Sequence, residues 1–491
     1  MKIRTLLLMF IFSFVNTFAQ EENIILFQSI NNELICDISY IDENNSYVFM
    51  LDERKLPYNN YNLMDYFYNS RQKVFMSNIN LNLIDSIEIK AVDGFKILLK
   101  QIHQVQNDTI IIHGVAYDTI ASDMQIAFIW LDYDLNILKD TLYGFKNIEE
   151  MPARVIVNQS NNLVIHGIFN PYYTKSDSKT NKYFLMEINT GGDQIQYVYD
   201  TLSMLGAGIT PLGSSGRYLT KVNNNTWNRI NSDFSIDTSF QLVLNNTSIW
   251  FMYPFIENQI LVYATYFQGL NPINPSILDF DLMTIILDKN VNLVNSIVFG
   301  TPDTCDMVDE IGFIHPDTLF VGGTKHVMNG PVDNWMMLRK MGFNGEVLFE
   351  LYYGGYGKYS LNNVLPTNDG GCLITGTWWD FYNYPDTLQQ YDAVIIKVDA
   401  NGLITGTYKP QLPFEVTDIL VYPNPGDDYL MVNSAKENLT FKLFDLTGKE
   451  ILNSGFDKNI RIETSNLIPQ TYIYSISKYG IEIKSGKWVK K

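Results

Sequence analysis

The sequence predicts an all-β protein, a closed ring of seven four-stranded sheets followed by a small β-sandwich. Its composition favours strands, because aromatic residues make up 14% of the 491 residues and charged residues make up only 18%. A strand-and-turn pattern also recurs about every fifty residues, which is typical of a repeat fold. The chain exceeds the length of one ordinary domain, so at least two units are expected.

The first element is a secretory signal peptide over residues 1–19. Lys2 and Arg4 give it a positive start, a short apolar run follows, and Ala19 offers the small residue that a signal peptidase reads. The apolar run is too short for a comfortable membrane span, and nothing later in the chain approaches one. We therefore expect an exported protein that begins at Gln20 and has no transmembrane span.

The repeat is clearest near the end of the ring. The apolar run "CLITG" closes at Gly376, the run "AVIIKVD" follows, and an Asn-Gly turn leads onward. The same order recurs upstream, where "LFVGG" closes at Gly323, "LVIHG" at Gly167 and "IIIHG" at Gly114. The step from Gly114 to Gly167 is 53 residues, and the step between the other two glycines is the same. We expect each of these glycines to end a strand.

Seven copies of this unit fit residues 20–412. Degenerate copies lie around Thr220 and Ala264, and an earlier copy starts at Ser46. A four-stranded unit cannot bury both faces of its own sheet, so neighbours must stack, and ring closure removes the exposed edges. The sequence therefore predicts a seven-bladed β-propeller, with the strand "NIILF" from Asn23 paired to the last blade. A row of β-sandwiches is the rival arrangement, but it does not predict a constant step.

The clearest repeat resembles those of a known group of propellers. Its segments "DGGCLITG" and "DAVIIKVDANG" are similar to the repeats of secreted bacterial propellers of the delta-60 type. The resemblance covers about four of the copies clearly. It implies a shape and no single activity, since one such fold hosts many functions.

The last element is a β-rich tail over residues 419–491. Its opening motif is "YPNP", the residues Tyr422, Pro423, Asn424 and Pro425. The hairpin "FDLTGKEI" around Gly448, the strand "LIPQTYIYSI" with Tyr472, and the basic ending "KWVKK" follow. In this order, the motifs resemble the type A C-terminal sorting domain of the type IX secretion system of the Bacteroidetes. The resemblance implies recognition by the type IX machinery and a protein that is secreted or attached to the outer cell surface. One position departs from the family pattern, with Thr471 in place of glycine.

Charge and cysteine count narrow the expected partners and chemistry. The formal net charge is −18 and no basic stripe occurs, so nucleic acid is not an expected partner. The three cysteines are an odd number, which leaves at least one unpaired. Free thiols are therefore expected, unless Cys305 and Cys372 form a bridge.

The sequence contains none of the short motifs that signal catalysis or cofactor binding. It has no His-Glu-x-x-His, no Gly-x-Ser-x-Gly and no phosphate-binding loop, so we predict no catalytic residue, no metal and no cofactor. His113 and His166 occupy the same slot in adjacent units, but a metal would need a third ligand, which the pattern does not offer. The segment "LDYDLN" from Leu131 lacks the glycine and the final glutamate of a calcium loop, which favours a hairpin turn.

Candidate ligand-binding residues come from long aromatic loops that follow the second strand of several units. We expect these loops to emerge on one face of the ring, where aromatic planes and amide donors suit sugar rings or peptides. Packing of the rings against one another is the alternative. The candidate residues are Tyr66, Tyr172, Tyr173, Phe267, Trp378, Trp379 and Tyr382.

The sequence favours an exported cell-surface or secreted protein that serves as a non-catalytic binding or adhesion scaffold. Its expected partners are the type IX secretion machinery and a glycan or a surface protein. A carbohydrate- or peptide-active hydrolase is the alternative, and it requires paired carboxylates that converge at the central channel. A structural part of a surface or gliding assembly is a third hypothesis.

Overall fold

The computed structural model divides the chain into two compact units, Met1–Thr405 and Gly406–Lys491. The described residues are 24–27, 31–41, 45–55, 67–105, 109–118, 123–145, 150–169, 182–200, 208–221, 226–255, 259–270, 278–300, 305–315, 318–327, 331–342, 346–383, 390–404, 419–434, 439–446, 448–478 and 481–491. The predicted signal peptide and the candidates Tyr66, Tyr172 and Tyr173 lie outside them. No helix in these ranges is long and apolar enough to cross a membrane.

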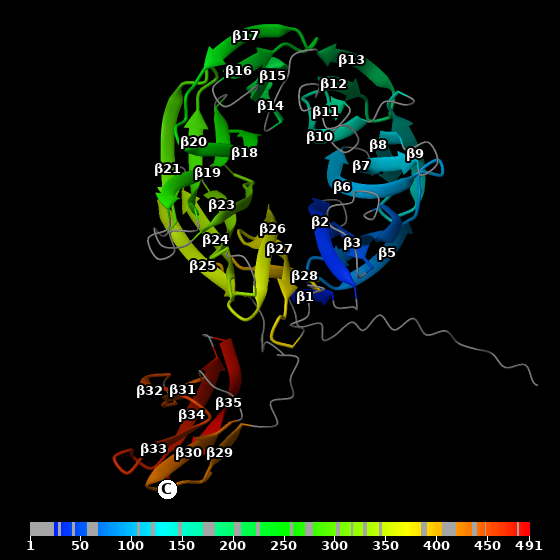
Figure 1. Ribbon diagram of the computed structural model, residues 1–491. Helices are drawn as coiled ribbons and strands as arrows, with labels where there is room; N and C mark the ends of the chain where they lie inside the picture. Colours follow the sequence, from blue (N-terminus) through cyan, green and yellow to red (C-terminus); the bar gives the residue numbers. More distant parts are fainter. Residues whose placement is uncertain are drawn as a thin grey trace, which may run out of the picture. The chain divides into compact units, whose positions relative to one another are not determined.

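The first unit is a ring of seven four-stranded antiparallel sheets, the blades (Figure 1). Blade 1 consists of β2 (Asn32–Ile41), β3 (Ser46–Arg54), β4 (Ser70–Asn78) and β5 (Leu83–Ile89). Blade 2 consists of β6 (Lys96–Val105), β7 (Thr109–Asp118), β8 (Asp123–Leu131) and β9 (Ile137–Tyr143). Blade 3 consists of β10 (Glu150–Val157), β11 (Leu163–Phe169), β12 (Lys182–Ile188) and β13 (Gln194–Asp200). Blade 4 consists of β14 (Ile209–Leu212), β15 (Arg217–Lys221), β16 (Thr226–Ile230) and β17 (Ile236–Gln241), with the short 3-10 helix η1 (Gly213–Ser215).

The remaining three blades follow the same order. Blade 5 consists of β18 (Thr247–Pro254), β19 (Ile260–Leu270), β20 (Leu278–Leu287) and β21 (Leu293–Phe299). Blade 6 consists of β22 (Met307–Gly312), β23 (Thr318–Lys325), β24 (Trp335–Gly342) and β25 (Val347–Gly354). Blade 7 consists of β26 (Lys358–Pro366), β27 (Cys372–Trp379), β28 (Asp392–Val398) and β1 (Ile24–Phe27). The predicted all-β fold with seven blades is confirmed.

Blade 7 joins the two ends of the ring. Its outer strand β1 comes from the N-terminal end of the chain and pairs antiparallel with β28, with Phe27 opposite Ala393. The Phe27 ring also lies 5.9 Å from the Phe49 ring and 5.3 Å from the Phe75 ring of blade 1, measured between centroids. The predicted pairing of "NIILF" with the last blade is therefore confirmed, and it covers an edge of β28 that would otherwise be unpaired.

The repeated glycine lies in the middle of the second strand, so the prediction that it ends this strand was wrong. In four blades, the first strand has a β-bulge directly after the residue that faces this glycine. A Cβ atom on Gly114 would lie 2.3 Å from the Leu98 carbonyl oxygen, and one on Gly376 would lie 2.4 Å from the Ser360 oxygen. In these four blades the regular step in the sequence therefore marks a bulge, because a glycine leaves room for the carbonyl.

The aromatic residue near the end of the fourth strand bonds one blade to the next. Tyr353 of β25 donates a hydrogen bond of 2.6 Å to the carbonyl of Gly402, in the turn that follows β28. Tyr143 of β9 makes the same bond to Gly192, in the turn between β12 and β13. A buried hydrogen bond of this kind contributes about 1 kcal/mol. Tyr143 and Tyr353 each precede a glycine in the sequence, and this shared feature has a physical cause in the packing of neighbouring blades.

The segment "LDYDLN" forms the turn between β8 and β9, which confirms the hairpin prediction. The Asp132 carboxylate accepts hydrogen bonds from the backbone amides of Asp134 and Asn136, at 3.0 and 2.7 Å. Leu135 adopts a left-handed backbone with φ of 56°, which costs about 1–2 kcal/mol for a residue other than glycine. Its side chain is buried, and that burial contributes a stabilisation of about 1.5–3 kcal/mol. Val291 holds the same conformation in blade 5.

The hydrophobic core of the ring lies between neighbouring blades. Val48 and Met50 of blade 1, for example, pack in one cluster with Ile112 and Ile129 of blade 2. Each blade thus buries its two faces against different neighbours, and stability depends on an unbroken ring.

The second unit is a small β-sandwich with its own core. One sheet contains β29 (Leu420–Tyr422), β30 (Tyr429–Asn433) and β33 (Asn459–Glu463). The other contains β31 (Leu439–Phe444), β32 (Glu450–Phe456), β34 (Thr471–Lys478) and β35 (Ile481–Val489). Leu430, Phe441, Tyr472 and Trp488 are buried between the two sheets.

Candidate functional site

The ends of the second strands define one face of the ring, called the loop face below. In blade 1, Arg54 at the end of β3 pairs with Asn32 at the start of β2. In blade 7, Trp379 at the end of β27 pairs with Lys358 at the start of β26. Because every blade repeats this antiparallel order, the loops after all second strands lie on the same face as the starts of the first strands.

The three aromatic candidates of blade 7 differ in how exposed their side chains are. Trp378 and Trp379 belong to β27 and are buried, with 6% and 4% of their surface exposed. Tyr382 lies in the following loop and is 42% exposed. Its hydroxyl donates a hydrogen bond of 2.6 Å to the Asp333 carboxylate, and its ring stacks on Tyr356 at 4.9 Å. Of these three side chains, only Tyr382 presents a surface on which a ligand could bind.

Phe267 lies in β19 and is half-buried. Its ring packs against Phe280 with 5.7 Å between centroids, within the same blade. Phe267 therefore packs within its own blade, whereas Tyr382 contacts the neighbouring blade 6 through Asp333. A shared aromatic surface across several blades stays a prediction, since the other candidates lie outside the described residues.

A pocket opens on the loop face where blade 1 meets blade 7. Its volume is about 320 Å³. Two of its lining residues are acidic, two are basic and two are phenols. They are Glu33, Asp52, Arg54, Lys358, Tyr359 and Tyr391. The pocket therefore exists only in a closed ring, because both ends of the ring contribute to it.

Hydrogen bonds across the ring closure hold the pocket walls. The Tyr391 amide donates to the Asn32 side chain at 2.7 Å, and the Glu33 amide donates to the Tyr391 carbonyl at 2.8 Å. Asp52 is held by the Arg54 guanidinium at 2.7 Å and by the Gln72 amide at 2.8 Å. Several polar groups of the pocket are therefore fixed before any ligand arrives.

The two buried tryptophans support the phenol rings of this pocket. Trp378 stacks on Tyr359 with 6.2 Å between centroids and an angle of 24° between planes. Trp379 packs against Tyr391 at 5.8 Å, and the Trp378 indole donates a hydrogen bond of 2.8 Å to the Tyr356 carbonyl. The sequence thus singled out residues that lie behind the pocket, and it missed those that line it. The lining could have been predicted from the closure strand. Because that strand pairs with the last blade, the residues just after it must lie beside the last blade.

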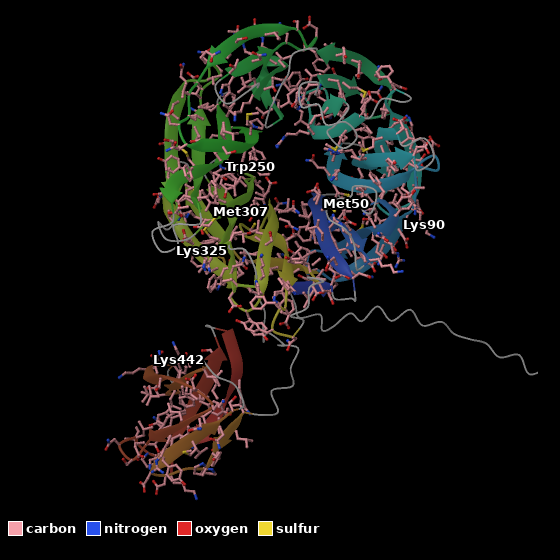
Figure 2. All side chains as sticks on the ribbon, viewed as in Figure 1. Met50, Lys90, Trp250, Met307, Lys325 and Lys442 are labelled. Atoms are coloured by element: carbon pink, nitrogen blue, oxygen red, sulfur yellow. The ribbon has the colours of Figure 1, made fainter. Side chains whose placement is uncertain are left out.

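The first strands of the blades lie around the centre of the ring (Figure 1), and six of them contain a bulge. Register shifts mark one or two bulge residues in six of these strands: Cys36, Lys100, Ala153, Trp250, Asp309 with Glu310, and Asn362. Trp250 is 53% exposed, and Figure 2 shows it beside the centre of the ring. Trp250 was not among the residues predicted from the sequence, because a bulge breaks the alternation by which exposed strand residues are recognised.

Asp37 and Glu310 bring carboxyl groups from blades 1 and 6 into one electrostatic environment. Burial raises the pKa of Asp37 to about 7, although the amides of Ile102 and Ile38 donate to its two oxygens at 2.7 and 2.9 Å. Burial raises the pKa of Glu310 to about 8. The positive charge of Arg154 opposes this rise, and the negative charge of Asp37 adds to it. The amide of Ile102 belongs to blade 2, so Asp37 also connects two blades.

An arginine and a tyrosine complete this group at the centre. Tyr253 donates a hydrogen bond to Glu310, and the Arg154 guanidinium lies 5.3 Å from the centre of the Tyr253 ring. Arg154 also donates to the Met252 carbonyl at 3.3 Å. The group thus joins blades 1, 3, 5 and 6. Each member has contacts within the protein, which is typical of groups that stabilise a ring.

These pKa shifts predict that the ring becomes more stable as the pH falls from 9 to about 6.5. In this range the carboxyls of Asp37 and Glu310 take up protons in the folded protein, whereas the unfolded chain keeps them ionised. Each group contributes at most about 1.4 kcal/mol per pH unit. Below about pH 6.5 the buried His103, His113 and His166 together offset this gain. Burial lowers the pKa of all three, so they bind protons in the unfolded chain but not in the folded protein.

Urea unfolding measured between pH 5 and pH 9 tests this expectation. We expect the free energy of unfolding to fall above about pH 7 and to level off below about pH 6.5. Glu310→Gln removes one of the titrating groups and should flatten the alkaline decline. Glu346→Gln is the matched control on an exposed residue and should leave the profile unchanged. A free energy that rises steadily towards pH 9 would contradict the assignment.

The histidines named by the sequence lie in different blades and different surroundings. His113 bonds to His103 with 2.8 Å between ring nitrogens, and burial lowers the pKa of both. His166 is fully buried and stacks on Tyr183 at 5.4 Å. Among the described residues, no three His, Cys, Asp or Glu side chains are grouped so that they could hold a metal.

The three cysteines are free thiols. Cys372 is buried in β27, and burial raises its pKa well above the ordinary value. Burial raises the pKa of Cys36 and of Cys305 as well. The bridge between Cys305 and Cys372 that the sequence left open is not formed.

In the second unit, the opening motif and the ending motif of the tail are bonded to each other. Trp488 donates a hydrogen bond of 2.8 Å to the Pro423 carbonyl. The Asn424 side chain donates to the Lys487 carbonyl at 2.6 Å and accepts from the Val489 amide at 3.0 Å. These contacts explain why "YPNP" and "KWVKK" occur together, since each supplies the hydrogen-bond partners of the other.

The other motif residues of the tail have separate structural roles. Tyr422 is 42% exposed and accepts a hydrogen bond of 2.7 Å from the Asn433 side chain. Gly448 adopts a φ of 84° in the turn between β31 and β32, a conformation that favours glycine. Tyr472 is buried, and its hydroxyl donates to the Ile468 carbonyl at 3.0 Å.

Residues 420–491 match the family model described as the secretion system C-terminal sorting domain. The match confirms the resemblance on which the tail was assigned, and it covers the whole described sandwich. No curated protein sequence matches the chain.

Solved structures with similar folds share little sequence with this chain. The β-propeller domain of Cps50 (Swd1) from Myceliophteria thermophila is 9% identical with a TM-score of 0.41, and the alignment covers 76% of this chain and 99% of that domain. PorZ, a surface component of the type IX secretion system of Porphyromonas gingivalis, is 8% identical with a TM-score of 0.25 and coverages of 93% and 81%. BamB from Moraxella catarrhalis is 7% identical with a TM-score of 0.33 and coverages of 76% and 93%. The chain is thus a β-propeller protein with a type IX secretion C-terminal sorting domain, which directs it to the outer cell surface or the extracellular space.

Proposed function

We propose that this exported propeller is a non-catalytic binding or adhesion protein that takes its ligand on the loop face. The observation that carries the proposal is the pocket of about 320 Å³ between blades 1 and 7. Its size is at the lower end of the range of about 300–1,000 Å³ found for ligand sites, and its polar groups are already fixed by hydrogen bonds. The assignment of the repeats to the delta-60 type is part of the proposal and rests on the glycine-centred motif.

Binding by the purified chain to an array of glycans, polysaccharides and peptides tests the proposal. Lys358→Met removes the ammonium group from the pocket and should lower the retained signal about tenfold or more. Lys90→Met is the matched control, because Lys90 is exposed at the outer rim of blade 1 (Figure 2). A chain that retains no probe, or a Lys358→Met variant that retains it as well as the wild type, would refute the pocket as the binding site.

A carbohydrate- or peptide-active hydrolase is the second candidate, and one observation favours it. The carboxyls of Asp37 and Glu310 have pKa values of about 7 and about 8, within the range of groups that exchange protons near neutral pH. We place it second because both oxygens of Asp37 accept backbone hydrogen bonds. Turnover that Glu310→Gln reduces about a hundredfold would favour the hydrolase over the scaffold.

A further inference from the structure

We infer that the pocket between blades 1 and 7 binds a short neutral saccharide, an inference that rests on the proposed binding function. The charged groups of the lining balance one another. Glu33 and Asp52 carry two negative charges, and Arg54 and Lys358 carry two positive charges, so the charged lining is balanced. An anionic ligand would face two carboxylates and a cationic ligand two basic groups, so neither gains a net attraction that offsets its desolvation.

The hydrogen-bonding groups of the lining also match those of a sugar. Carboxylates only accept hydrogen bonds, lysine and arginine only donate them, and Ser360 and Thr377 in the same lining do both. A sugar hydroxyl donates and accepts, so a ligand with several hydroxyls can pair with every class of group in the pocket. An apolar ligand would instead displace the water that is bonded to these groups and would offer no hydrogen bonds in its place.

Two tyrosines with rigid support also belong to the lining. Tyr359 and Tyr391 line the pocket, and Trp378 and Trp379 pack against them from the interior. An aromatic side chain that is held in one orientation loses little entropy when a ligand stacks on it. Phenol rings combine an apolar face with a polar tip, which suits the mixed surface of a sugar ring.

The pocket also couples binding to ring closure. Asp52 belongs to the first blade and Lys358 to the last, and the closure strand β1 precedes the pocket residues of blade 1 directly in sequence. A saccharide that contacts both blades binds only the closed ring. Its binding should therefore raise the unfolding temperature of the propeller in a concentration-dependent manner.

The test is a set of calorimetric titrations and thermal unfolding scans on the purified full chain. The probes are neutral mono- and disaccharides, the matching uronic acids and amino sugars, and dipeptides. We expect a neutral saccharide to bind and to raise the unfolding temperature, and its charged counterparts to bind about tenfold more weakly or worse. Tyr391→Ala should abolish binding, Tyr391→Phe should retain it because the ring remains, and Lys90→Met should leave it unchanged.

The outcomes separate the ligand class from the proposed function. If a dipeptide or a charged sugar binds in place of the neutral saccharides, and Lys358→Met weakens that binding, the saccharide inference falls while the binding function stands. If no probe of any class binds, both fall. If a neutral saccharide binds equally well to Tyr391→Ala, with the fold of that variant shown intact by its circular dichroism, the pocket is not the site and the inference is wrong.

Discussion

Replacing Trp488 with alanine is expected to unfold the C-terminal unit and to abolish export of the chain. Trp488 has 0% of its surface exposed, and its ring lies 6.0 Å from the Tyr472 ring in the middle of the sandwich core. Removing a fully buried tryptophan costs about 3–5 kcal/mol, which is a large part of the about 5–15 kcal/mol that stabilises a whole domain.

The expected effect exceeds that of an ordinary core substitution because Trp488 connects both ends of the tail. Its indole nitrogen bonds to the Pro423 carbonyl, so the change leaves that acceptor without its partner and loosens the opening motif from the last strand. A Cβ on Gly426 would lie 2.8 Å from the same indole, which shows how closely the opening segment packs on it. We expect the sorting machinery to recognise a folded surface of this unit, and this surface would be lost together with the core.

Two measurements on the full chain test the Trp488→Ala prediction. Limited proteolysis should degrade the tail from residue 419 onward while the propeller remains resistant. In a host with a type IX system, the amount of protein at the surface and in the medium should fall about tenfold or more. The control is Ile468→Ala, which truncates a side chain that is 66% exposed in the same unit. Normal export of Trp488→Ala would show that the machinery does not read the folded tail.

The ring could be predicted from the sequence because its period has a local cause. In four blades a bulge follows the residue that faces a glycine of the second strand, and this glycine, which makes room for a carbonyl such as that of Leu98, recurs at a regular step. The positions Thr220 and Ala264, chosen only by spacing, face the corresponding residues Ile209 and Ile249 of their first strands. The spacing of the strands thus continues where the glycine has been replaced, with a bulge in blade 5 and no register shift between the first two strands of blade 4.

The candidate site could not be predicted in the same way, because it depends on contacts between the two ends of the ring. Glu33 and Lys358 meet only after seven blades have closed, and no local pattern connects them. Trp378 and Trp379 were placed in a loop because Gly376 was taken as the end of its strand, whereas β27 continues to Trp379. Because the predicted strand ended too early, the two buried tryptophans were predicted to be exposed binding residues.

Loss of the closure strand β1 is expected to open the ring and to destroy the pocket. Deleting Ile24–Phe27 leaves the outer edge of β28 unpaired and uncovers the apolar cluster that contains Leu373 and Ile395. The milder variant Phe27→Ala removes one ring from its contacts with Phe49 and Phe75 and should cost up to about 3 kcal/mol, since Phe27 is only partly buried.

Hydrogen exchange locates the effect of these two changes. Amides of β28 should exchange much faster in the deletion variant, while those of β16 on the opposite side of the ring should change little if blades open one by one from the closure. Phe145→Ala, at a phenylalanine that is 50% exposed, is the matched control for Phe27→Ala and should leave β28 protected. The pocket lies where the first and last blades pack against each other. Opening at β1 should therefore also cancel any stabilisation by a bound ligand. If β28 stays protected after the deletion, the packing between blades 1 and 7 closes the ring without help from the added strand.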